Sequence, residues 1–211
     1  MSEPLIILRR QLDLENLWQI PEGCQPEGLV RSTDGAPPSL SSTVSAFYDA
    51  TFLYVIFRFD DDEVRATYRD HDDPLYEEDV VEVFLSPAEP AVYFEIEVNP
   101  LGTVFDARID SPEGTRASMQ ADLAWHATGL WTASRQVRAE ASATFLTETL
   151  IAIPFLSMGV PAPEAGSSWR GNFFRIDRSS RGDEFQAWRP TMKNPADFHV
   201  VSAFGRLLFQ N

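Results

Sequence analysis

The stretch that decides the fold is residues 80–99, VVEVFLSPAEPAVYFEIEVN, in which two apolar runs flank a proline-containing turn. In each run every second residue is apolar, and carboxylates occupy several of the positions between them. Side chains alternate between the two faces of a strand, so this period of two predicts a pair of strands. One face of the pair is expected to enter a core, and the other to carry Glu82 and Glu97.

The same signal recurs on both sides of this pair. Residues 43–59 predict a hairpin that turns at 49–51, and residues 5–8 predict a first strand. Further strands are expected at residues 103–109, 123–126, 131–139, 145–153, 169–177, 186–188 and 203–209. Pro154 favours a brief helix through Met158. Many short strands separated by turn signals predict an all-β fold, an antiparallel, jelly-roll-like β-sandwich with a short helix or two.

The length of 211 residues fits a single domain over 1–211, whose first 42 residues, rich in Pro, Gly, Ser and Thr, are expected to be less regular. The net charge of −15 opposes binding to nucleic acid and to anionic membrane surfaces. A single cysteine, Cys24, excludes an intramolecular disulfide. No signal peptide is visible, so we expect a cytoplasmic protein if Met1 is the native start, and a secreted or periplasmic one if the chain was trimmed.

Several segments of the chain occur in a characteristic order. They are FLYV at 52–55, DDPLYEEDVVEVF at 72–84, YFEIEVNPLGTVFD at 93–106, AIPF at 152–155, WRGNF at 169–173, WRPT at 188–191 and the stretch 198–207. Together they resemble a family-nine carbohydrate-binding module, a member of the DOMON-like sandwich superfamily. The resemblance implies a sandwich that binds sugars without cleaving them, and that grips the reducing end of a glucan or xylan between two aromatic rings.

The resemblance also implies site residues. Tyr76 falls where the family has one ring, often a tryptophan, and Trp188 falls near the second. Glu82, Glu97 and Asn172 fall on strands that supply polar contacts in the family. Glu97 stands where some members have a basic residue, and no tryptophan occurs near Arg65, so the sugar is left open.

The chemistry of a pyranose agrees with this assignment. Its C–H face suits an aromatic ring, and its hydroxyl rim suits charged and amide groups, which form strong hydrogen bonds. We therefore expect Glu82, Glu97, Asn99 and Arg175 to contact the rim. The alternative is that Trp188 belongs to the core, that the acids are solvated, and that Arg175 neutralises Glu82 or Glu97.

Acidic residues are dense between Asp60 and Glu82, which makes this loop a candidate site for structural calcium, as the family resemblance also implies. His71, His126 and His199 show no metal-ligand spacing, so the metal ligands stay unknown. A haem held by a histidine and one of Met119, Met158 or Met192 is a further alternative within the superfamily.

Other functions stay open at this point. A glycosidase would need two suitably spaced carboxylates, such as Glu82 and Glu97, one of them with a raised pKa. A sandwich of this fold can also bind another small ligand or a protein. The expected partners are a carbohydrate and a polysaccharide-degrading enzyme.

Overall fold

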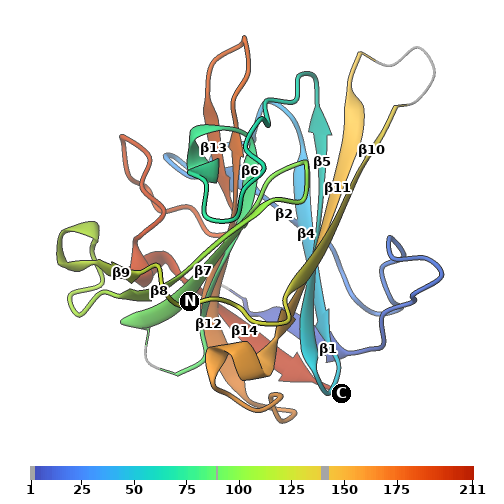
Figure 1. The fold of residues 1–211 in the computed structure, drawn as a ribbon, viewed down its shortest axis with the longest axis vertical. Coiled ribbons are helices and arrows are strands. Elements are labelled where there is room, and N and C mark those ends of the chain that lie inside the picture. Colours follow the sequence, from blue (N-terminus) through green and yellow to red (C-terminus); the bar gives the residue numbers. More distant parts are fainter. Residues whose placement is uncertain (1–2, 89, 139–142) are drawn as a thin grey trace.

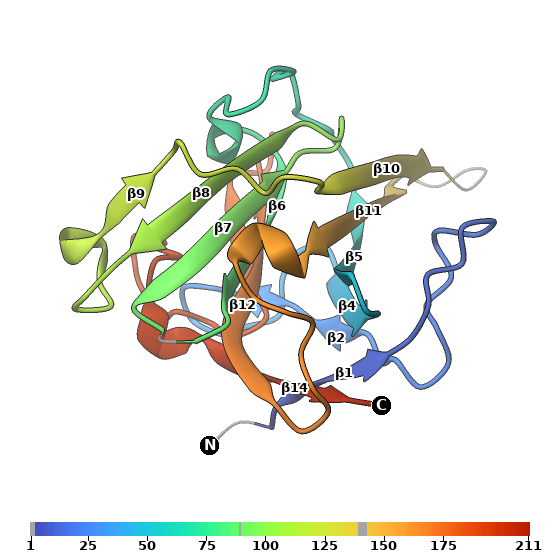
Figure 2. The same cartoon turned by 60° about the horizontal axis from the view of Figure 1, so that its bottom comes forward.

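A computed structural model describes residues 3–88, 90–138 and 143–211. Its strands follow one hydrogen-bonded path that folds back on itself, so that two layers face each other (Figures 1 and 2). This arrangement is the β-sandwich that the alternating pattern predicts. Among the described residues, no helix is long and apolar enough to span a membrane.

The first layer contains the predicted hairpin at residues 43–59. Its strands, in spatial order, are β10 (Trp131–Val137), β11 (Phe145–Pro154), β5 (Phe52–Asp61), β4 (Ser42–Tyr48) and β1 (Leu5–Arg9). β1 pairs in parallel with β4 and with β14 of the second layer, and thereby joins the two layers. The segment that was expected to be less regular thus supplies the connecting strand. These parallel pairs depart from a purely antiparallel sandwich.

The second layer contains the pair from which the fold was predicted. Its strands, in spatial order, are β14 (Gly205–Gln210), β12 (Ser168–Asp177), β6 (Val80–Ser86), β7 (Val92–Val98), β8 (Val104–Asp110) and β9 (Gln120–Asp122). β6 and β7 pair in an antiparallel register that sets Glu82 opposite Glu97. The prediction of a strand at residues 123–126 is wrong, because β9 ends at Asp122.

Shorter elements cover the edges and outer faces. β2 (Glu27–Gly28) pairs with β4, and β3 (Val30–Arg31) pairs with β13 (Glu184–Ala187), which in turn pairs with β12. The described residues also form four 3-10 helices: η1 (Leu75–Glu77), η2 (Arg116–Ser118), η3 (Phe155–Met158) and η4 (Val201–Ala203). η3 is the brief helix expected after Pro154.

Buried apolar residues form separate clusters on the different faces of the two layers. The largest apolar cluster lies between them and includes Val83, Ile96 and Phe173. A second cluster, with Phe84 and Phe174, lies on the outer face of the second layer, beneath the loops near η1 and η4. Because successive residues of β6 and β12 point to opposite clusters, both faces of this layer are covered. The candidate site described below lies on the outer face.

Candidate ligand-binding site

A pocket of about 410 Å³ opens on the outer face of the second layer. Its floor is formed by β6, β7, β8 and β12, and its walls by η1, η2, β13 and the loop before η4. The wall residues are mostly apolar or aromatic, and the floor carries three carboxylates. This volume is within the range typical of small-molecule sites. We call this hollow the acidic pocket.

The floor of the acidic pocket contains Glu82, Glu95 and Glu97, which we call the glutamate triad. All three are buried, and one carboxylate oxygen of each lies within 4.8 Å of the others. The β-pleat explains the grouping: Glu95 and Glu97 are two residues apart on β7, and Glu82 is opposite Glu97 on β6. Period-two alternation therefore brings all three side chains to one face.

Burial controls the protonation of the triad. It raises the pKa of Glu95 to about 7, and it raises the pKa of Glu82 and Glu97 well above their usual range, with a further contribution from neighbouring carboxylates. The Glu95 and Glu97 side chains share a hydrogen bond. One Glu97 oxygen, Oε2, is buried without a hydrogen-bond partner. At neutral pH the triad therefore retains protons and offers both hydrogen-bond donors and acceptors.

His199 extends the polar floor. Its Nε2 lies 3.7 Å from Glu95 Oε1, and its Nδ1 lies 2.7 Å from the Tyr93 hydroxyl. Burial, together with the charge of Arg116, lowers the pKa of His199 to about 4. The imidazole is thus neutral at neutral pH and does not compensate the charge of the triad.

Tyr76 stands at the wall of the pocket on η1, and 48% of its surface is exposed. Its backbone N–H favours the charged form of the Glu97 carboxylate and so lowers the pKa of Glu97. Its carbonyl accepts a hydrogen bond of 2.7 Å from Arg178. These two contacts hold the backbone of an exposed aromatic residue next to the triad. The structure thus brings together Tyr76, Glu82 and Glu97, three of the residues singled out from the sequence.

Trp188 does not lie in the pocket, contrary to the prediction. It is 3% exposed and belongs to the core between the layers, where its ring centroid is 5.8 Å from that of Phe173. The ring lies against the backbone of Gly205, where an added Cβ would be 2.1 Å from Trp188 Cζ3. A ring enclosed in this way offers no face to a sugar.

Asn99 and Asn172, which were predicted to contact the sugar, form hydrogen bonds with the backbone instead. Asn99 Oδ1 accepts hydrogen bonds of 3.0 Å from the N–H groups of Leu101 and Thr103, which fixes the turn after β7. Asn172 is fully buried, and its amide bonds the Arg189 backbone through both its oxygen and its nitrogen. Neither lines the acidic pocket, so the expected rim contacts are not supported.

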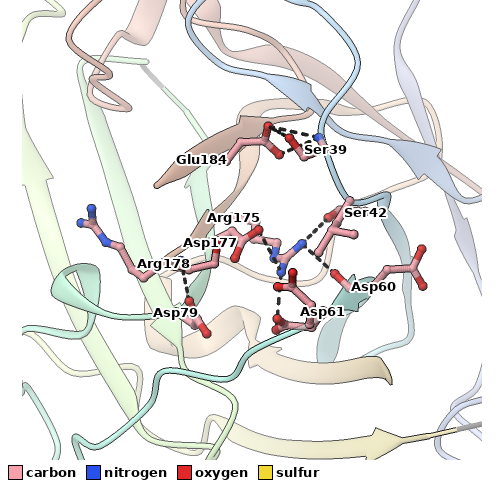
Figure 3. Close-up of polar contacts among 12 residues, drawn as sticks. Ser39, Ser42, Asp60, Asp61, Asp79, Arg175, Asp177, Arg178 and Glu184 are labelled. Carbon is pink, nitrogen blue, oxygen red and sulfur yellow. Dashed lines mark hydrogen bonds and ion pairs between the residues drawn. The ribbon is translucent and has the colours of Figure 1, made fainter. Parts of the chain in front are cut away.

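Arg175 is likewise directed away from the pocket. It has the same strand parity as Phe173 and points between the layers. Its guanidinium donates to Ser42 Oγ at 3.2 Å and lies 3.5 Å from Asp61 and 3.8 Å from Asp177 (Figure 3). The expectation that Arg175 neutralises Glu82 or Glu97 is therefore wrong.

Sequence reasoning missed part of the pocket. The sequence did contain a signal for Glu95, because this residue lies two positions before Glu97 on the same strand and so points to the same face. His199 and Phe198 had none, since they come from a loop that follows β13 and reaches the triad only through the tertiary fold. The pocket has no tryptophan among its described lining residues, so tryptophan fluorescence is an unsuitable reporter of binding there.

Comparisons with known proteins show the family and the fold of the chain. Residues 35–209 match the model of carbohydrate-binding family 9. The fold is similar to that of a Bacteroides uniformis protein named for a proposed carbohydrate-binding role, at 18% identity and a TM-score of 0.68, over 89% of this chain and 86% of the other. No curated protein matches the chain by sequence.

Two further similar structures show a family 9 carbohydrate-binding module of Caldicellulosiruptor kristjanssonii, one in complex with glucose and one with cellotriose. Each is 12% identical with a TM-score of 0.60 over 99% of this chain, and the matches cover 96% and 94% of those chains. At such low identity the likeness shows a shared fold.

Proposed function

Because the chain belongs to carbohydrate-binding family 9, we propose that the acidic pocket binds the terminal unit of a glucan- or xylan-type saccharide without cleaving it. The observation that carries the proposal is the exposed ring of Tyr76 beside three buried carboxyl groups. A pyranose needs these two surfaces together, one for its C–H face and one for its hydroxyls.

The triad supplies the hydroxyl contacts. A charged carboxylate accepts from a hydroxyl more strongly than a neutral acceptor does, and a buried site excludes competing water. The unpartnered Glu97 Oε2 is an acceptor that a sugar hydroxyl would satisfy. The raised pKa values leave protons in the triad that can be donated to ring or hydroxyl oxygens.

The size of the acidic pocket favours one end of a saccharide over its middle. A volume of about 410 Å³ suits one or two sugar units, and the floor closes the path of a longer chain. The anomeric hydroxyl is the most acidic hydroxyl of a reducing sugar, so it is the best donor to a carboxylate. We infer that the reducing end enters the pocket first.

Cleavage is disfavoured by the placement of the acids. A glycosidase sets its two carboxyl groups on either side of the scissile bond. Here all three glutamates project from β6 and β7 and converge within 4.8 Å on one floor. A raised pKa alone does not make this arrangement catalytic, because no second carboxylate faces the triad among the described lining residues except Asp197, which pairs with Arg116.

The test is calorimetric titration with glucose, cellobiose, cellotriose and xylobiose, and with the corresponding alditols. We expect Tyr76→Ala to weaken binding about tenfold, the size of a lost aromatic contact. Leu156→Ala removes an 81% exposed side chain of η3 outside the pocket and should leave affinity unchanged.

Two outcomes would contradict the proposal. Absence of heat with every sugar, in a protein that is folded by circular dichroism, would reject carbohydrate binding. Loss of binding in a folded Trp188→Phe variant, with Tyr76→Ala unaffected, would place the site elsewhere. Equal affinity for sugars and alditols would reject only the reducing-end assignment.

One observation favours a second candidate, an ammonium-bearing ligand such as an amino sugar. None of the described arginines or lysines forms an ion pair with the triad, although Arg116 and Arg178 line the same pocket and their charges lower the pKa of Glu82. A ligand ammonium would therefore take the ion-pair position beside the three carboxyl groups. Titration with glucosamine beside glucose separates the two candidates. Tighter binding of glucosamine, and its loss in Glu82→Gln, would favour the cationic ligand.

A further inference from the structure

A second group of polar side chains lies outside the acidic pocket. His71 and Asp72 precede η1, Asp106 belongs to β8, and His126 lies in the loop between β9 and β10. We call these four residues the His–Asp cluster. None of them is among the residues that line the acidic pocket. The spacing of the histidines gave no metal signal in the sequence, because 55 residues separate His71 from His126.

The ligand atoms of the cluster converge on one point. His71 Nε2 lies 3.3 Å from His126 Nδ1, 3.6 Å from Asp106 Oδ1 and 3.3 Å from Asp72 Oδ1. His126 Nδ1 lies 3.1 Å from Asp106 Oδ1 and 4.0 Å from Asp72 Oδ2. One ligand atom from each residue falls within 4.8 Å of all the others.

These separations are compatible with a coordination shell, although two of them, His71 Nε2 to His126 Nδ1 and His126 Nδ1 to Asp106 Oδ1, are also hydrogen bonds between the side chains. Zinc holds nitrogen and oxygen ligands at about 2.0–2.2 Å in a tetrahedron, so that two ligand atoms of one ion are about 3.3–3.6 Å apart. Four of the five distances are between 3.1 and 3.6 Å. A cation at the centre would be reached by both imidazoles and both carboxylates with small side-chain adjustments.

Two further contacts support a ligand role. Asp106 is 2% exposed, and its second oxygen, Oδ2, accepts a hydrogen bond of 2.9 Å from the Ala127 N–H. This contact orients the carboxylate in the way that outer partners orient metal ligands. Asp72 Oδ1 is a buried oxygen that receives no hydrogen bond.

We propose that His71, Asp72, Asp106 and His126 bind one divalent transition-metal ion, zinc being the best fit. Imidazole nitrogen suits zinc and its neighbours, whereas calcium prefers six to eight oxygen ligands. Of the acid-rich loop from Asp60 to Glu82, only Asp72 takes part. The ion would tie the loop that leads into η1 to β8, and Tyr76 follows Asp72 by four positions.

The test uses the intact protein, stripped with a chelator and titrated with zinc and with calcium. We expect one equivalent of zinc to bind and to raise the midpoint of thermal unfolding, with no comparable effect of calcium. The double variant His71→Ala/His126→Ala should lose at least a hundredfold in zinc affinity and lose the thermal shift. Both side chains are about half exposed, so this variant should fold.

Matched variants make the result specific. Asp70→Asn removes a neighbouring exposed charge outside the cluster and should bind zinc as the parent does. Asp106→Asn keeps an acceptor for the Ala127 N–H and should weaken zinc about tenfold or more. The proposal is overturned if the parent binds no zinc, if the double variant binds it equally well, or if calcium binds as tightly.

Discussion

Replacing Glu95 by glutamine removes one ionisable group from the glutamate triad and preserves its size. Burial raises the pKa of Glu95 from 4.5 to about 7. The folded protein therefore keeps a proton that the unfolded chain has already released, and stability falls as the pH rises from about 4.5 through about 7. A shift of this size corresponds to about 3 kcal/mol at high pH.

About 2 kcal/mol of that cost develops between about pH 5 and pH 8, and the glutamine variant does not incur it. The free energy of unfolding of Glu95→Gln, measured by urea denaturation, should rise relative to the parent by about this amount over that interval. Glu82 and Glu97 titrate together with Glu95, so the change belongs to the triad as a unit.

The comparison with the parent removes a competing effect. Burial lowers the pKa of His199 to about 4, so this residue destabilises both proteins as the pH falls below about 6.5. Glu164→Gln, at an exposed glutamate, serves as the control and should follow the parent at both pH values. The reasoning would be refuted if the difference in free energy of unfolding between Glu95→Gln and the parent stayed the same from about pH 5 to pH 8. It would also be refuted if the parent gained stability relative to the variant toward pH 8.

Three further substitutions test the placement of core residues by urea denaturation. Trp188→Ala should cost about 3–5 kcal/mol, as expected for a buried aromatic, and a loss below about 1 kcal/mol would contradict its position in the core. Gly205→Ala should be destabilising because its Cβ would lie 2.1 Å from Trp188 Cζ3, and the cost should shrink in a Trp188→Ala background, so additive costs would argue against this contact. Arg175→Ala should cost about 3–5 kcal/mol near pH 8, because it removes the arginine that pairs with buried Asp61 and leaves Asp177 with Arg181 alone. The cost should be smaller near pH 5, because burial raises the pKa of Asp61 to about 6, and the opposite pH trend would be inconsistent with this pairing.

The fold could be predicted because its signal is local. Alternation at residues 80–99 specified two strands, their facing carboxylates and the face that enters the core, since side-chain direction in a strand depends only on position. The same reasoning placed Glu82 and Glu97 on one surface and Tyr76 in the adjoining loop. The same alternation also predicts the position of Glu95, because Glu95 lies two residues before Glu97 on the same strand and therefore points to the same face.

What the sequence by itself determined, then, is the β-sandwich and the common face of Glu82 and Glu97 on β6 and β7. The tertiary structure alone decided that Trp188 is core, that Arg175 points between the layers, and that His199 joins the triad. It also brought His71 and His126 together. These outcomes depend on which surfaces pack against each other over long sequence distances, and packing of that kind leaves no periodic trace in the chain.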